Sequence, residues 1–481
     1  MNAADFQALL PLLVLACGAV ILMLQIAFWR DIKLTSTLTL LSLIAAALSV
    51  IWAADSSPRF VTPLLRADHL ALVFSALFCL AAAVTTVFSI DYLRQRGDQP
   101  EEYFLLLVLS TLGACVLAYA AHVASLLLGL ELMSVALYAL IAYPDKTQLP
   151  LEAAIKYLVL SGAASATALF GFALIYAATG TLAFAAMGDQ LANAHAGNAV
   201  LLVAAVMVVA GLGFKLSLVP FHMWTPDVYD GAPAPITGFL ASVAKAAVFV
   251  ALVRWFLASD LFRFEILIDS IALLAILSML AGNVLALLQN NIKRMLAYSA
   301  IAHMGYLVII LVVGSNTELR PLAIEAGMYY LIAYTVTTLA AFGLLTVIST
   351  EGSRRENIQL HDVSGLFWHQ PLYACLMFVA LLSLAGIPLT AGFIAKFYLL
   401  GAAVSDSRWI LLASLVIGSA IGIYYYLRVI FYMTRRVEEH NNTPVVPAGW
   451  MVRAVTCALI ATILLLGTVP QPLMEYLRSI L

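Results

Sequence analysis

Four ionisable side chains lie within long apolar stretches of this sequence. They are Glu131 in LLLGLELMSVALY, Lys215 in VVAGLGFKLSLVP, Lys245 in FLASVAKAAVFV and Lys396 in GIPLTAGFIAKF. A charge at the centre of a bilayer costs at least about 2.5–3.5 kcal/mol, so such residues are rare and are presumed to be paired and functional. Burial brings lysine and glutamate side chains nearer to titration at neutral pH. Groups of this kind can load and release protons, so we expect a proton relay.

Each of the four has a structural alternative. The Lys396 ammonium could extend from a helix end to the membrane surface, whereas Lys215 and Lys245 lie too centrally for an easy extension. Glu131 could merely neutralise a lysine.

Several other polar residues are secondary candidates. Lys156 stands only a few residues inside its apolar stretch, so relay and surface roles are equally open for it. His222 and His303 could bridge protonatable groups by hydrogen bonding, although a single membrane histidine is as often structural. Arg254 and Arg428 lie toward the ends of their stretches, and arginine does not readily release its proton. We interpret both arginines as anchors.

Two prolines interrupt apolar stretches that are too long for one straight helix. Pro220 follows Lys215 by five residues, and Pro388 precedes Lys396 by eight. Proline removes an amide donor and disrupts the preceding turn, so nearby carbonyls lose their helical partners. Within a membrane, such carbonyls must be satisfied by protein or water. A packed kink is the alternative, but two breaks near lysines predict a polar, hydrated interior.

The composition identifies the solvent in which these elements fold. Of the 481 residues, 64% are hydrophobic and 10% charged, with a mean hydropathy of +1.01. A soluble domain carries roughly 25% charged residues, so a bilayer is expected. The net charge of −2 gives no basic surface for nucleic acid. The five cysteines are scattered without CxxC spacing, which gives no support to zinc, iron–sulfur or haem sites.

About fourteen stretches are long enough to cross a bilayer, since a crossing needs roughly 20 apolar residues. They are 5–29, 33–53, 69–92, 102–119, 121–143, 152–180, 198–229, 233–258, 266–288, 292–314, 321–350, 369–404, 407–434 and 449–470. The first has no Lys or Arg before it, so we expect a retained helix and not a cleaved signal peptide. Of the 24 basic residues, twelve lie at odd-numbered connections and six at even-numbered ones. The positive-inside rule then places both termini on the outer side.

The two halves of the chain are weakly similar to each other. LEAAIKYLVLSGAASATALFG at 151–171 matches IEAGMYYLIAYTVTTLAAFG at 324–343, and Pro220 matches Pro388 at a similar offset. Five helices per copy invert the second copy in the membrane, as in many secondary transporters. We expect an all-α integral membrane protein with two inverted five-helix repeats, each containing a Pro-broken helix. The expected units are 1–98 (three helices), 99–260 and 261–440 (the repeats), and 441–481 (a C-terminal helix).

Longer motifs resemble a known family. They are LGFKLSLVPFHMWTPDVYDGAPAPITGFLASVAKAA at 212–247, LLLGLELMS around Glu131, NNIKRMLAYSAIAHMGY at 290–306, and SLAGIPLTAGFIAKF at 383–397. The chain resembles the antiporter-like membrane subunits of bacterial NADH:quinone oxidoreductase (respiratory complex I) over its whole length. The motif from Trp224 to Pro235 and the lysine at 396 are similar to the subunit N branch, and the end at Leu481 differs from subunit L, which has a long additional helix.

The resemblance implies a function and a setting. Glu131 and Lys215 would form the ion pair of the first half-channel, Lys245 would link the halves, and Lys396 would end the second. The pair would act as a switch, and quinone reduction in other subunits would drive proton translocation. No cofactor is expected in this chain, with FMN, iron–sulfur clusters and quinone in partner subunits. The family further implies subunits M and K as neighbours and a bacterial inner-membrane location.

Two other functions remain open on the sequence. A subunit of a multi-subunit sodium/proton antiporter or of a membrane-bound hydrogenase shares this fold and its lysines. A passive scaffold that only docks its neighbours predicts that Glu131 and Lys215 tolerate neutral replacement.

Overall fold

The computed structural model describes residues 2–94, 100–143, 148–193, 199–351, 358–436 and 449–480. Within these ranges, 13 helices are long and apolar enough to cross a membrane. They are α2 (Leu10–Phe28), α3 (Ile32–Ala54), α4 (His69–Arg94), α5 (Glu101–Tyr119), α6 (Val123–Ala142), α7 (Gln148–Thr179), α9 (Ala199–Leu216), the continuous segment Ala234–Ala258, α13 (Glu265–Leu287), α14 (Ile292–Val313), α15 (Arg320–Glu351), α19 (Trp409–Thr434) and α20 (Trp450–Thr468). Two shorter apolar helices, α17 (Pro371–Ala385) and α18 (Ala391–Ser405), form the expected fourteenth crossing between them.

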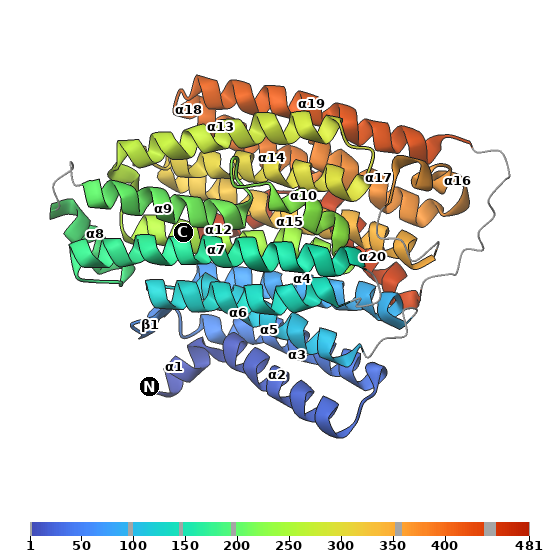
Figure 1. The fold of residues 1–481 in the computed structure, drawn as a ribbon, viewed down its shortest axis with the longest axis horizontal. Coiled ribbons are helices and arrows are strands. Elements are labelled where there is room, and N and C mark those ends of the chain that lie inside the picture. The colour runs from blue at the N-terminus through green and yellow to red at the C-terminus, as the bar shows by residue number, and fades with distance from the viewer. Residues whose placement is uncertain are drawn as a thin grey trace.

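The long helices run side by side in one bundle (Figure 1). The helices α14 and Ala234–Ala258 occupy its centre, because 94% of the most apolar part of each is buried. The corresponding value for α3, which lies with α2 at one edge of the bundle, is 28%. The central helices carry Lys245 and His303, so both candidates lie where neighbouring helices exclude lipid.

Short elements connect the long helices. They are α1 (Ala3–Ala8), the antiparallel strands β1 (Arg59–Thr62) and β2 (Leu65–Ala67), α8 (Phe184–Asn193), α10 (Trp224–Gly231), the 3-10 turns η2 (Leu261–Arg263) and η3 (Leu360–Val363), α16 (Leu366–His369) and α21 (Gln471–Ile480). The β-hairpin and the terminal helix α21 were not predicted from the sequence. The hairpin strands have only four and three residues, and α21 is too short to cross a membrane, so neither produces a hydropathy signal.

Both prolines interrupt helices, as expected. The chain leaves α9 at Leu216 and resumes as α10 at Trp224, while α17 ends at Ala385 and α18 begins at Ala391. Ser217 has φ = 62° after the first helix, and Gly386 and Leu389 have φ = 82° and 72° in the second connection. A left-handed residue directly after a helix turns the chain away from the helix axis. Backbone groups at both breaks therefore lie outside regular helix.

The two halves have matching elements in matching order. The pairs α5–α6 and α13–α14 pack closely, and α7 and α15 each have 32 residues. The broken helices α9–α10 and α17–α18 follow, and then the segment Ala234–Ala258 and α19. Five crossings per half invert one half relative to the other, in agreement with the expected repeat. The unit boundaries after 98, 260 and 440 remain predictions.

The side of the membrane on which each connection lies also remains a prediction. Four basic residues used in that assignment, Arg96, Lys146, Arg354 and Arg355, lie outside the described ranges. Lys293, another of them, is fully buried, and its ammonium donates to the Ala232 carbonyl at 2.6 Å. This lysine, counted beside a connection in the sequence, is therefore part of the packing at the start of α14.

Candidate functional site

Lys215 lies in the last turn of α9, just before the first break. Its side chain is only 6% exposed, and its Nζ donates to Ser134 Oγ on α6 at 2.9 Å and to Ser161 Oγ on α7 at 2.6 Å. Three helices therefore converge on one ammonium. The contacts exclude an extension of Lys215 to the membrane surface.

Glu131 does not form the expected ion pair. No carboxylate oxygen of Glu131 lies within 4 Å of Lys215 Nζ among the ion pairs of the described residues, and Glu131 Oε1 is buried without a hydrogen-bond partner. The residue lies on α6 one turn before Ser134, whose hydroxyl holds the lysine. The Glu131 carboxylate and the Lys215 ammonium are therefore not in contact in this structure.

Side chains at the start of α10 form hydrogen bonds across the first break, to α9 and to the residue just after it. Trp224 Nε1 donates to the Phe214 carbonyl at 3.0 Å, and Thr225 Oγ1 donates to Ser217 Oγ at 2.7 Å. His222 lies in the connection, 8% exposed, and its Nδ1 is buried without a hydrogen-bond partner. The histidine is thus next to the break, as predicted, and is not tied to the Lys215 ammonium.

Lys245 occupies the centre of the bundle. The segment Ala234–Ala258 contains α11 (Ala234–Phe239), the π-helical turn η1 (Leu240–Ala244) and α12 (Lys245–Ala258), so the lysine follows a π turn directly. Such turns are frequent at functional sites. Lys245 is 1% exposed; its Nζ has no hydrogen-bond partner and lies 5.5 Å from the centre of the Tyr229 ring.

Further buried polar atoms without hydrogen-bond partners lie on α10 and α15. They are Tyr229 Oη, Tyr334 Oη, Thr335 Oγ1 and Thr338 Oγ1. Unpaired buried polar groups are rare in folded proteins, because a buried donor or acceptor without a hydrogen bond costs about 1–3 kcal/mol. Together with the unpaired Lys245 Nζ, these groups indicate a polar interior, in agreement with the prediction from the helix breaks.

His303 connects this central region to the second half. Its Nδ1 lies 2.6 Å from Tyr330 Oη on α15, and its Nε2 lies 3.3 Å from Tyr426 Oη on α19. Tyr426 Oη in turn bonds to Ser299 Oγ. Both ring nitrogens of a neutral histidine can take part in hydrogen bonds, one as donor and one as acceptor. His303 therefore lies between the hydroxyls of Tyr330 and Tyr426, and its role in proton transfer remains a prediction.

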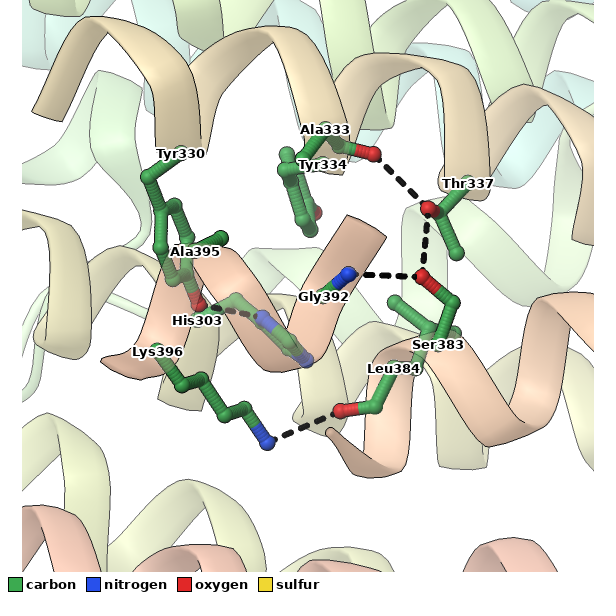
Figure 2. A pocket seen from close by; sticks show the side chains of 10 residues that line it. All are labelled: His303, Tyr330, Ala333, Tyr334, Thr337, Ser383, Leu384, Gly392, Ala395 and Lys396. Atoms are coloured by element: carbon green, nitrogen blue, oxygen red, sulfur yellow. Dashed lines mark hydrogen bonds between the residues drawn. The ribbon is translucent and has the colours of Figure 1, made fainter. Parts of the chain in front are cut away.

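Lys396 on α18 binds the backbone that the second break leaves free. Its Nζ donates to the carbonyls of Leu384 and Ala385, at 2.9 and 3.0 Å, and lies 5.4 Å from the centre of the Tyr306 ring. Figure 2 shows the ammonium pointing at the end of α17. The side chain is 8% exposed, so the alternative of an extension to the surface is wrong.

A small cavity lies beside Lys396. Its volume is about 10 Å³, close to the least that holds one water molecule. The lining residues are His303, Tyr330, Ala333, Tyr334, Thr337, Ser383, Leu384, Gly392, Ala395 and Lys396 (Figure 2). The cavity therefore joins the histidine bridge to the terminal lysine and to residues of the second break.

Lys156 is not among the central residues. Its Nζ pairs with Glu152 at 2.7 Å and with Asp227 at 3.0 Å, and its side chain is 42% exposed. Asp227 also pairs with Arg294 Nη1 at 2.8 Å. These contacts favour the surface role that the sequence left open for Lys156.

Two long-range ion pairs, each with one buried partner, are not apparent from sequence. Arg254, interpreted as an anchor, is 6% exposed and pairs with Asp68 at the start of α4. Glu325, 3% exposed on α15, forms two bonds with Arg478 of α21, each of 3.2 Å, and this carboxylate raises the pKa of Arg478. Arg428, the other presumed anchor, donates to the Leu287 carbonyl at the end of α13. All three contacts join residues far apart in the chain, which hydropathy cannot reveal.

The comparisons with known proteins agree on one family. The family model "NADH:quinone oxidoreductase/Mrp antiporter, TM" matches residues 120–422. NADH-quinone oxidoreductase subunit N of Methylococcus capsulatus is 46% identical over 475 residues, covering 99% of this chain and 95% of that protein.

Two solved structures are similar over nearly the whole chain. A chain of respiratory complex I from Thermus thermophilus is 33% identical with a TM-score of 0.81, covering 97% of this chain and 99% of that one. A chain of the membrane-bound sulfane sulfur reductase, an archaeal respiratory membrane complex, is 25% identical with a TM-score of 0.86, covering 100% and 96%. The fold thus also occurs in chains of respiratory membrane complexes.

Proposed function

The chain belongs to the subunit N family of NADH:quinone oxidoreductase, and from this premise we propose that its protons pass along Glu131, Lys215, Lys245 and Lys396. As a proton-translocating membrane subunit, it works within an enzyme complex whose redox chemistry takes place in other subunits. The proposal concerns which residues of this chain carry the proton and in what order.

One observation carries this assignment. Lys215, Lys245 and Lys396 are 6%, 1% and 8% exposed, yet none of them forms an ion pair with a described acid. A buried charge that serves only stability is normally paired, because an uncompensated one costs several kcal/mol. These ammonium groups face hydroxyls, an aromatic ring and main-chain carbonyls instead. Lysines without carboxylate partners are free to change protonation during turnover.

The order of transfer follows from the positions of the groups. A proton taken up in the first half reaches Lys215 and then Lys245 at the centre of the bundle. His303 and Tyr330, joined at 2.6 Å, border the cavity that also contains Lys396. Proton transfer across the remaining gaps requires water, for which the unpaired hydroxyls near Lys245 supply partners. Lys396 then releases the proton to the outer side.

The Glu131–Lys215 pair acts as the switch in this scheme. When the two groups touch, the negative carboxylate favours the protonated lysine. When they separate, as in the structure, Lys215 can pass its proton to Lys245. Quinone reduction in partner subunits supplies the energy that changes the arrangement.

We further propose subunits M and K as neighbours, FMN and iron–sulfur clusters in partner subunits, an inner-membrane location, and termini on the outer side.

The test is replacement of Lys215 by alanine in the complete complex. Proton pumping and NADH–quinone turnover are measured together in membrane vesicles, and assembly is checked in the same membranes. Loss of both activities in an assembled complex supports the relay. Unchanged pumping would contradict it and would favour a passive scaffold. Lys33→Ala, at the exposed start of α3, is the control for removal of a lysine outside the bundle centre.

A further inference from the structure

We propose that Ser134 and Ser161 form a hydroxyl cradle that holds Lys215 away from Glu131 and makes the lysine able to release its proton. The two serines are positioning residues in this view. The inference rests on the proposed relay through Lys215 and adds the groups that define the open arrangement of its switch.

The cradle is built from two helices that face α9. Ser134 on α6 and Ser161 on α7 are both fully buried, and each accepts a hydrogen bond from Lys215 Nζ. Tyr138, one turn after Ser134, donates to Ser161 Oγ at 2.8 Å. Ser161 Oγ is therefore shared by a lysine and a tyrosine.

The chemistry of a hydroxyl differs from that of a carboxylate in one decisive way. An ionised carboxylate only accepts hydrogen bonds, so it stabilises the protonated lysine and offers nothing to the neutral amine's lone pair. A serine hydroxyl both accepts and donates. Ser134 and Ser161 can accept from the ammonium and, after rotation of their O–H bonds, donate to the neutral amine. The cradle therefore accommodates Lys215 in both protonation states, whereas Glu131 favours only the charged one.

The alternative position of the ammonium is nearby. Glu131 precedes Ser134 by three residues on α6, so the two side chains lie on one face of that helix, about 5 Å apart along its axis. Glu131 Oε1 is buried and unpaired, which leaves it available to accept the ammonium. Lys215 can thus exchange between the carboxylate and the hydroxyls by rotation of its own side chain.

Aromatic contacts connect the cradle to the first helix break. The ring of Tyr138 packs edge-on against Tyr157, with centroids 5.2 Å apart, and Tyr157 stacks on Trp224 at 4.8 Å. Trp224 in turn donates to the Phe214 carbonyl, one residue before Lys215. A movement at the break is therefore transmitted to the groups that hold the lysine. This linkage gives a structural route by which the rest of the complex changes the occupancy of the cradle.

The first experiment removes each hydroxyl in turn. Ser134→Ala and Ser161→Ala are expected to slow coupled NADH–quinone turnover and pumping about tenfold, the equivalent of one lost hydrogen bond to a charged group. Ser161→Thr, which keeps a hydroxyl, should restore most of the rate. Ser165→Ala is the matched control: this serine lies one turn further along α7, and its buried hydroxyl has no partner. Rates are compared at equal amounts of assembled complex.

The second experiment tests competition between the serines and Glu131. In a Glu131→Asp background the carboxylate is withdrawn by one methylene, so Ser161→Ala should slow turnover less than in the native chain. Coupled residues give such non-additive effects, whereas a purely structural serine gives additive ones. Additive effects would overturn the cradle.

The outcomes separate this inference from the relay itself. If Lys215→Ala abolishes pumping while Ser134→Ala and Ser161→Ala behave like Ser165→Ala, the cradle is wrong and the relay stands. If Lys215→Ala pumps normally, the relay is wrong and the cradle with it. Both proposals are supported if Ser134→Ala and Ser161→Ala slow turnover, Ser161→Thr restores it, and Ser161→Ala has a smaller effect in the Glu131→Asp background.

Discussion

Replacement of Gly386 by alanine probes the contact between Lys396 and the second helix break. Gly386 follows α17 with φ = 82°, and a Cβ atom added there would lie 2.9 Å from Lys396 Cδ and 3.4 Å from its Nζ. The lysine side chain must therefore move. Because Nζ holds the carbonyls of Leu384 and Ala385, we expect this movement to weaken or break those bonds.

Two terms set the size of the effect. The left-handed backbone costs a non-glycine residue roughly 1–2 kcal/mol of folding free energy. A hydrogen bond to a charged group contributes about 1.5–3 kcal/mol, so the loss of one such bond slows a step that depends on it by about ten- to hundredfold. The first term acts on stability alone, whereas the second acts on proton transfer through Lys396.

A second glycine separates these terms. Gly180 has φ = 70°, and a Cβ added there would meet nothing within 4 Å. Gly180→Ala thus carries the backbone cost without a collision. In vesicles with equal amounts of assembled complex, Gly386→Ala should reduce pumping and NADH–quinone turnover at least about tenfold, and Gly180→Ala less than about twofold. Equal activity in the two variants would refute the role assigned to the Lys396–carbonyl contact.

Two further replacements test the ion pairs. Lys156→Ala should change coupled turnover by less than about twofold relative to the native chain. Half-exposed ion pairs contribute roughly 0–1 kcal/mol, and Asp227 keeps Arg294 as a partner. A loss as large as that of Lys215→Ala would place Lys156 in the relay. Arg254→Ala should destabilise the subunit by about 1.5–3 kcal/mol, because Asp68 loses one charged hydrogen-bond partner and keeps Arg66. Thermal unfolding of the purified complex measures this loss, and Arg66→Ala, which removes the exposed partner of the same acid, should have little effect.

Most of the fold follows from local properties of the chain. Apolar length predicts the crossings, because a bilayer requires about 20 apolar residues in each. The prolines at 220 and 388 predict the two interruptions, since proline cannot continue the hydrogen-bonding of a helix. The central positions of Lys215 and Lys245 in their stretches predict their burial, whereas Lys396 was left with a surface alternative; the structure buries all three.

Contacts between distant residues could not be predicted in the same way. The hydroxyl partners of Lys215 lie on two other helices, 81 and 54 residues away, and nothing at the lysine itself marks them. The family resemblance implied that Lys215 pairs with Glu131, but a hydroxyl or carbonyl oxygen can also accept hydrogen bonds from an ammonium. Lys156 was ambiguous for the related reason that Asp227 comes near it only after the chain folds back.

The helix end that binds Lys396 has a consequence for which amino-acid substitutions this subunit can accept during evolution. Both acceptors are main-chain oxygens, which every amino acid possesses, so no substitution at Leu384 or Ala385 deletes them. Drift at those two positions can alter packing while the ligands of the ammonium persist. The contact is vulnerable only at Lys396 itself and where the chain must turn, above all at Gly386. A search for an acidic side chain that pairs with Lys396 would therefore miss the main-chain oxygens that hold its ammonium.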